Sequence, residues 1–291
     1  MKNKFTWIYG WLMLSPALIL LFAFTHYPAI VTLFSSFFST PRGKRKAIFV
    51  GLDNYSQLLQ DEVFWKVLWN NTMYAFGTVP ISIALALAMA LWVNSKMPGR
   101  WFLRISYFSP TVLPLIAVGN IWLFFYTPGF GLFAQIGNLF GLHQQNLLGT
   151  QSTVLWAVMV VAVWKEAGFF MIFYLAALQA MPVQLREAGA IEGAGNWYFF
   201  RRITFPLLMP TTLFVMVNAT INSFRLIDHI LIMTEGGPDN ASSLLLYYIY
   251  ETAFKYWDTA YGATLTVVLL VILSVIAIGQ FFFLDRKVHY Q

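Results

Sequence analysis

Long uncharged stretches alternate with short polar ones along this chain. Residues 5–41, 67–95 and 105–164 contain no Asp, Glu, Lys or Arg. About 20 apolar residues in a helix cross the core of a lipid bilayer, so stretches of this length predict membrane-spanning helices. The pattern therefore predicts an all-α, polytopic membrane protein.

Turn-forming residues divide the apolar stretches into six predicted spans. The stretch 105–164 is too long for one helix, and Pro128-Gly129-Phe130-Gly131 together with the polar residues 143–146 interrupt it. The dipeptide Tyr27-Pro28 predicts a bend in the first span. The predicted spans cover about 7–34, 70–94, 103–126, 153–180, 206–233 and 261–284.

The polar segments between the spans predict shorter elements. We expect a surface helix at about 54–60, an interfacial helix after the third span and an amphipathic segment at 244–256. The domain division predicted from this pattern is a first span with an extracytoplasmic loop, 1–66, and a core of five spans, 67–291. The core includes a cytoplasmic loop at 181–205.

Composition supports membrane insertion and excludes several kinds of active site. The chain of 291 residues is 59% hydrophobic and 10% charged, whereas soluble proteins carry about 25% charged residues. It has no cysteine, which excludes disulfides and thiol nucleophiles. We find no His-x-x-x-His metal pair and no Gly-x-x-x-x-Gly-Lys-Ser/Thr phosphate loop. An ATP-driven role would therefore need the ATPase on another chain, with no cofactor or metal bound here.

The positive charges predict the orientation. Six spans place both termini on one side, together with loops 95–104 and 181–205. The ten basic residues of that side are Lys2, Lys4, Lys96, Arg100, Arg104, Arg186, Arg201, Arg202, Arg286 and Lys287. The six of the other side are Arg42, Lys44, Arg45, Lys46, Lys66 and Lys255. The positive-inside rule places the termini in the cytoplasm, although the cluster 42–46 opposes it and would suit an extracytoplasmic partner or anionic headgroups.

Residues 181–205, which we call the polar island, separate two apolar spans. Pro182 suits the first turn of a helix, and Gly193 and Gly195 can end that helix. Asn196 is expected to cap a second short helix, and Pro206 to start the next span. The island is predicted to fold as helix, glycine turn and helix.

The island resembles the EAA loop of permease subunits in binding-protein-dependent ATP-binding cassette (ABC) importers. Five residues fall on that pattern: Glu187, Ala188, Gly193, Ile203 and Pro206. Gly189 and Phe205 depart from it. The resemblance implies that this loop docks into an ATPase subunit, with Glu187 as a charged contact and Gly193 allowing a sharp turn. Glu192 is a further candidate of the same coupling loop. The alternative is a short connector in which these residues are incidental.

Other segments resemble the carbohydrate branch of these importers, and most of all the first permease of glycerol-3-phosphate importers. The similarity to the carbohydrate branch lies in 51–55, 178–182, 234–238 and 247–254. The similarity to the glycerol-3-phosphate permease lies in 163–165, 174–179 and 287–291. The resemblance implies a second homologous permease, two ATPase subunits and an extracytoplasmic solute-binding protein as partners, in the lipid bilayer of a bacterial inner membrane. Nothing points to nucleic acid.

Polar residues within spans are candidates for a solute path, because charge in a bilayer is costly. Asn218, Asn222, Arg225 and His229 are spaced four, three and four residues apart, with Asp228 able to pair with Arg225 and Thr211 extending the same face. Lys165 is a further candidate, adjacent to Glu166. The alternative for all of them is structural bonding between helices.

Two functions remain open at this point. The first is an importer permease with no enzymatic activity of its own, for a sugar or a sugar or polyol phosphate. The second is an ion-coupled secondary transporter of a small polar solute, in which Lys165, Glu166, Arg225 and Asp228 would bind the coupling ion.

Overall fold

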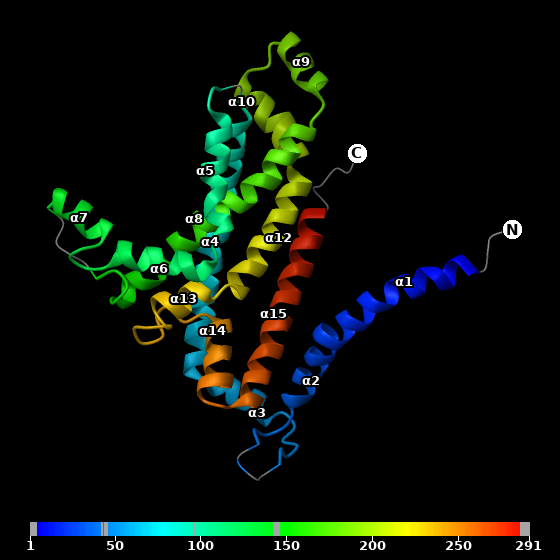
Figure 1. Cartoon of the computed structure of the whole chain (residues 1–291), viewed down its shortest axis with the longest axis vertical. Helices are drawn as coiled ribbons and strands as arrows, with labels where there is room; N and C mark the ends of the chain where they lie inside the picture. The colour runs from blue at the N-terminus through cyan, green and yellow to red at the C-terminus, as the bar shows by residue number, and fades with distance from the viewer. Residues whose placement is uncertain (1–4, 42, 44–45, 96, 142–145, 286–291) are drawn as a thin grey trace. The chain divides into compact units, whose positions relative to one another are not determined.

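The computed structural model in Figure 1 describes residues 5–41, 43, 46–95, 97–141 and 146–285. These residues form helices joined by turns, with one isolated β-bridge between Phe38 and Phe49. The all-α prediction is confirmed. The predictions for the terminal residues 1–4 and 286–291, and for Arg42, Lys44, Arg45 and Lys96, lie outside the described residues.

The helices account for the predicted spans. Four single stretches are long and apolar enough to cross a membrane: Trp7–Ser35, Glu62–Asn94, Gln151–Ala180 and Thr259–Phe282. Two bent pairs pass the same test, Arg100–Val112 with Leu115–Tyr126 and Asn196–Leu207 with Met209–Met233. The described residues thus contain up to six spans when each bent pair counts as one, in agreement with the predicted six-span fold.

The chain forms two compact units. One comprises residues 1–61 and 249–271, and the other comprises residues 62–248 and 272–291. The last span therefore contributes to both units. The division into 1–66 and 67–291 drawn from the sequence stays a prediction.

The first unit is built around a short surface helix. Its helices are α1 (Phe5–Leu21), η1 (Phe22–His26), α2 (Tyr27–Ser35), α3 (Asp53–Gln60), η3 (Glu251–Lys255) and the first part of α15 (Thr259–Asp285). Asn54 of α3 donates hydrogen bonds to the carbonyls of Ser36 and Phe38. Tyr261 of α15 donates to Asp61 over 2.6 Å. Polar side chains thus close the loop that follows the first span.

The second unit holds the remaining helices. They are α4 (Glu62–Asn94), α5 (Arg100–Val112), α6 (Leu115–Tyr126), α7 (Leu132–Leu139), α8 (Gln151–Ala180), α9 (Val183–Ile191), α10 (Asn196–Phe199), η2 (Phe200–Thr204), α11 (Phe205–Leu207), α12 (Met209–Arg225) and α13 (Asp228–Met233). The helix α14 (Leu245–Tyr250) crosses the boundary between the units. Alanines 86 and 90 of α4 are fully buried beside Phe170 and Tyr174 of α8. Small residues on one helix let the other approach closely, as is usual between membrane helices.

The third span is broken, which corrects the prediction of one helix over 103–126. The helix α5 ends at Val112, Leu113 is extended (ψ 134°), and α6 starts at Leu115. A proline disfavours the helical conformation in the residue before it, and Pro114 therefore ends α5. The axes of α5 and α6 differ by 102°, a turn that Figure 1 shows clearly.

The fifth span also departs from the predicted continuous helix over 206–233. The helix α12 begins at Met209 and ends at Arg225, and Leu226 is extended (ψ 107°) before α13 starts at Asp228. The axes on either side of Leu208 differ by 64°. The prediction of one polar face running from Asn218 to His229 is therefore wrong, because the helix ends before His229.

Candidate functional site

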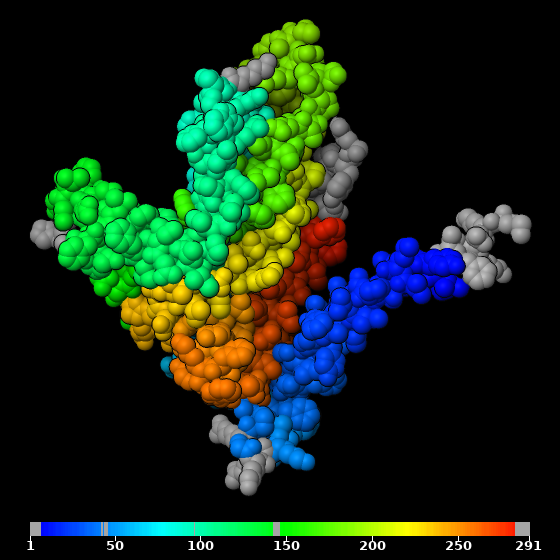
Figure 2. All heavy atoms as spheres, in the orientation of Figure 1, coloured from blue at the N-terminus to red at the C-terminus, as the bar shows by residue number. Residues whose placement is uncertain are grey.

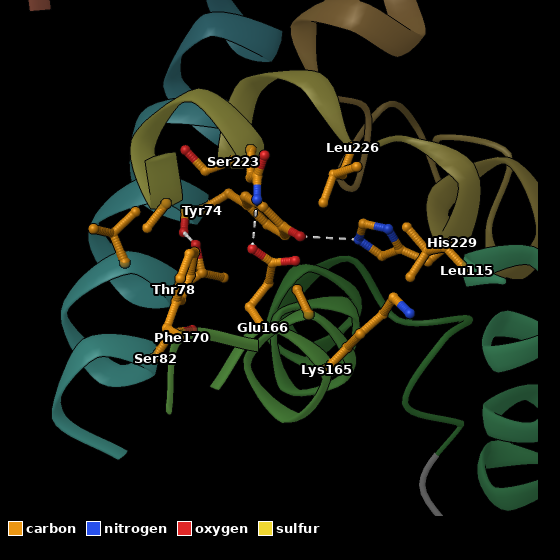
Figure 3. Close-up of a pocket in the computed structure, with 14 residues that line it drawn as sticks. Tyr74, Thr78, Ser82, Leu115, Lys165, Glu166, Phe170, Ser223, Leu226 and His229 are labelled. Atoms are coloured by element: carbon orange, nitrogen blue, oxygen red, sulfur yellow. Dashed lines mark hydrogen bonds between the residues drawn. The ribbon is translucent and has the colours of Figure 1, made fainter. Parts of the chain in front are cut away.

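A small pocket with a mixed polar and apolar lining lies inside the second unit, between α4, α8, α12 and α13 (Figure 3). Its polar lining comes from all four helices: Tyr74, Thr78, Ser82, Lys165, Glu166, Asn222, Ser223 and His229. The space that the centre of a water-sized molecule can reach is about 20 Å³. This is enough for about one water molecule, so the pocket is closed to a sugar in this conformation.

Two hydrogen bonds cross the pocket, and both are drawn in Figure 3. The amide of Asn222 donates to Oε2 of Glu166 over 2.7 Å, which joins α12 to α8. The hydroxyl of Tyr74 lies 3.0 Å from Nε2 of His229, which joins α4 to α13. His229 is fully buried, and its Nδ1 has no hydrogen-bond partner among the described residues. A polar atom of this kind can bind a water molecule or a solute hydroxyl in the pocket.

The structure brings only some of the predicted path residues together. Asn222, His229 and Lys165 line the pocket. Asn218 instead donates to the carbonyl of Phe214 in its own helix. Arg225 is exposed and Asp228 half-buried, and the described part of the chain has no ion pair between them.

Sequence reasoning missed the contribution of α4. Tyr74, Thr78 and Ser82 are spaced four residues apart in the second span. This spacing places them on one helical face. The same test that singled out the polar residues of the fifth span could have found them.

Lys165 and Glu166 do not pair with each other. Lys165 donates to carbonyl oxygens of Pro110, Thr111 and Leu113, at 3.0, 3.3 and 2.6 Å. Glu166 accepts the bond from Asn222. Lys165 therefore bonds to the end of α5, and Glu166 bonds to α12. This divergence fits the roughly 100° between successive side chains on a helix.

The loop that follows α13 is bonded to the first turns of α4 through residues 239–243. The ammonium of Lys66 lies 2.8 Å from Oδ2 of Asp239, and Asn70 donates to the carbonyls of Asn240 and Ser243. The hydrogen bond and the charge of Lys66 hold the pKa of Asp239 below its usual range. The helix that carries these contacts, α4, begins at Glu62, eight residues before the span predicted to start at about residue 70.

The polar island folds as helix, turn and helix, as predicted. Pro182 precedes α9, which ends at Ile191, and Gly193 has a φ of +70°. Only glycine adopts this conformation without cost, which explains the turn. Asn196 does not cap α10: it is the first helical residue, and Gly195 stands at the N-cap without a side-chain bond. Pro206 lies in the first turn of the short α11 rather than in the long helix α12.

The residues that match the EAA pattern lie in and just after α9, in η2 (Ile203) and in α11 (Pro206). Figure 2 shows the yellow-green surface of the segment 183–199 at the top of the view. Glu187, Ala188, Glu192 and Gly193 are exposed, as is Pro206, and Ile203 is half-buried. The hydrophobic side chain of Ile191 is 88% exposed. A single exposed apolar side chain is common on protein surfaces, so docking at this position stays a prediction.

Gly189, which departs from the EAA pattern, has a packing reason. It is the buried residue of α9, and it lies against the ring of Phe199 from α10. A Cβ at this position would lie 2.9 Å from Cδ2 of Phe199. The glycine therefore lets α9 and α10 pack on each other within the island.

Replacing Gly189 with alanine is expected to loosen the island. Overpacking of this kind costs about 1–3 kcal/mol. Amide hydrogen exchange across 183–199 should therefore be faster in Gly189→Ala. The matched control is Gly195→Ala, where a Cβ would meet nothing within 4 Å, and exchange should stay at the wild-type rate. Unchanged exchange in Gly189→Ala would show that this contact does not hold the island together.

Residues 79–290 match the family described as "Binding-protein-dependent transport system inner membrane component". The chain belongs to this family. The permease is 33% identical over 285 residues to the sn-glycerol-3-phosphate transport system permease protein UgpA of Agrobacterium fabrum, covering 97% of each chain. It is 29% identical over 280 residues to a probable starch degradation products permease, AmyD of Thermoanaerobacterium thermosulfurigenes, covering 96% of this chain and 95% of AmyD.

A solved structure agrees with the fold. A bacterial alginate ABC transporter, in complex with its alginate pentasaccharide-bound periplasmic protein, contains a chain that superposes with a TM-score of 0.84 at 21% identity. The match covers 95% of this permease and 93% of that chain. The resemblance to ABC importer permeases is thus confirmed, and the chain is a multi-pass membrane permease subunit rather than an enzyme.

Proposed function

We propose that this permease imports a sugar or a sugar or polyol phosphate, such as glycerol 3-phosphate, across a bacterial inner membrane. The observation that carries the proposal is full-length similarity to permeases that handle starch degradation products and glycerol 3-phosphate. The pocket supports it, because amide, carboxylate and hydroxyl groups are suited to binding a polyhydroxylated solute.

The proposed complex contains three kinds of partner chain. They are a second homologous permease, two ATPase subunits that bind ATP and dock at the polar island, and an extracytoplasmic solute-binding protein. This permease itself would bind no cofactor, and both of its termini would lie in the cytoplasm. The exposed Glu187 and Glu192 and the exposed turn at Gly193 support docking at the island.

Coupling can follow a short route through the chain. The island continues through η2 (Phe200–Thr204) and α11 (Phe205–Leu207) directly into α12, which carries Asn222 into the pocket. Movement of the island by ATP-driven closure of the ATPases would shift α12 and strain the Asn222–Glu166 bond. Because the pocket now holds only about one water molecule, a sugar needs such a rearrangement to pass.

The proposed solute path comprises Asn218, Asn222, Arg225, Asp228 and His229, and Lys165 lines the same pocket. Asn222 and His229 contribute polar atoms within the pocket. Arg225 is exposed at the end of α12, where its guanidinium would suit the charge of a phosphate.

The solute can be determined with the cognate binding protein. Calorimetric titration of that protein against a panel of sugars and glycerol phosphates should give tight binding for one class. Vesicles that contain the complete complex should then take up the same compound in an ATP-dependent manner. Binding of amino acids or peptides, with no response to sugars or glycerol phosphates, would contradict the proposed solute class.

A further inference from the structure

The break between α5 and α6 leaves backbone carbonyls without helical partners. The carbonyl of Pro110 would accept from the N–H of residue 114 in a continuous helix, but that residue is proline and has no N–H. Leu113 is extended, so the carbonyls of the last turn of α5 lose their partners as well. In a membrane such groups need a donor within the protein.

Lys165 supplies that donor from a neighbouring helix. Its ammonium lies 2.6 Å from the carbonyl of Leu113, 3.0 Å from that of Pro110 and 3.3 Å from that of Thr111. The three N–H bonds of an ammonium match three acceptors. A cation is also favoured at the C-terminal end of a helix, which carries partial negative charge.

The backbone approach beside Lys165 is unusually close. Gly168 lies three residues further along α8, on the same side of the helix. A Cβ at Gly168 would collide with the carbonyl oxygen of Tyr107 in α5. The glycine thus lets α5 lie against α8, within reach of the Lys165 side chain.

The direction of α6 determines one wall of the pocket. A Cβ at Gly119 of α6 would lie 3.4 Å from the side chain of Ile232 and 3.7 Å from Cα of His229, both in α13. His229 in turn contacts the hydroxyl of Tyr74 across the pocket. Contacts therefore run without interruption from the α5–α6 break through α6 and α13 to the Tyr74–His229 bond.

We propose that Lys165 is a positioning residue that holds the α5–α6 break in its bent form and thereby places α6 and α13 around the pocket. This assigns Lys165 a role other than contact with the solute. Three carbonyls already occupy the ammonium, and the neighbouring Glu166 is bonded to Asn222 rather than to Lys165. The distance measurement below concerns only the geometry of this chain. The uptake measurement also rests on the proposed function.

The test measures the bend directly. The chain has no cysteine, so Ile105→Cys and Phe124→Cys introduce unique spin-label sites on α5 and α6, at side chains that are 58% and 63% exposed. Electron–electron resonance distances are recorded in the complete complex with unlabelled partner subunits. Lys165→Met keeps the length of the side chain but removes the donor, and Lys165→Arg keeps a cation that can donate to several carbonyls.

The bent form should depend on the cation. We expect a longer or broader distance distribution in Lys165→Met and a wild-type distribution in Lys165→Arg. The maximal uptake rate should fall about tenfold in Lys165→Met, the equivalent of one lost hydrogen bond to a charged group, with unchanged half-saturation by the binding protein. Lys165→Arg should restore the rate.

Two results would overturn the proposal. One is a wild-type distance distribution in Lys165→Met, which would mean that the ammonium does not hold the bend. The other applies if the Lys165→Met variant fails to assemble. In that case Lys165→Gln, whose neutral amide can donate two hydrogen bonds, is compared with Lys165→Arg. Identical distance distributions in these two variants would contradict a role for the charge. A wild-type complex that transports neither sugars nor glycerol phosphates would refute the proposed function but leave the distance test intact.

Discussion

Charge reversal at Glu187 is expected to abolish solute-stimulated ATP hydrolysis by the assembled importer, while the permease still inserts into the membrane. Glu187 is exposed in α9, and exposed substitutions change folding free energy by only about 0.5 kcal/mol. A lysine at this position would either face a positive charge of the proposed ATPase subunit or stay unpaired in the interface. Both outcomes weaken association. The measurement is ATPase activity of the reconstituted complex with the loaded binding protein, together with the amount of permease in the membrane.

The matched control is Glu62→Lys. Glu62 is also exposed, in the first turn of α4, and is separated from the island by the length of that helix. It should keep normal coupling. Normal stimulation of ATP hydrolysis in Glu187→Lys would remove this residue from the docking surface, and equal losses in both variants would indicate a nonspecific effect of charge.

Removing the amide of Asn222 is expected to reduce uptake at least tenfold without preventing assembly. In Asn222→Ala the carboxylate of Glu166 loses the 2.7 Å bond that joins α8 to α12. Leaving a charged group without its hydrogen-bond partner costs about 1.5–3 kcal/mol. Uptake of the radiolabelled solute into vesicles should show the loss, and co-purification with the partner chains should remain normal.

Two further variants test whether the loss of uptake in Asn222→Ala comes from the pocket or from removing any asparagine amide from a helix. Asn120→Ala is the control, because among the described residues the Asn120 amide donates only to the carbonyl of Ile116 in its own helix. This variant should keep normal uptake. Glu166→Gln retains an acceptor for Asn222 but removes the charge, so it should retain more uptake than Asn222→Ala. Wild-type uptake in Asn222→Ala would exclude this bond from the transport cycle.

The positions of the spans were predictable because each depends on a long, mainly apolar run with few charged residues. Gln151–Ala180 and Thr259–Asp285 lie close to the predicted 153–180 and 261–284. The breaks within the third and fifth spans were harder to predict. Pro114 gave a local signal for the first break, but no proline or glycine near Leu226 indicated the second.

The pocket was only partly predictable for a related reason. Periodicity within one span can show that Asn222 faces inward, but not which helix it meets. The bond between Asn222 and Glu166 and the bond between Tyr74 and His229 each join segments more than fifty residues apart. The role of Lys165 likewise depends on the carbonyls that Pro114 exposes in another helix, and these become visible only when the helices are placed.

The most direct test of the central claim compares the energy source for uptake. Vesicles are prepared with the complete complex, or with this permease alone, and supplied with either ATP and the loaded binding protein or an ion gradient. We predict uptake only with the complete complex, ATP and the binding protein, and its loss in Glu187→Lys. Uptake by this chain alone, driven by an ion gradient without ATP, would contradict the account and favour a secondary transporter.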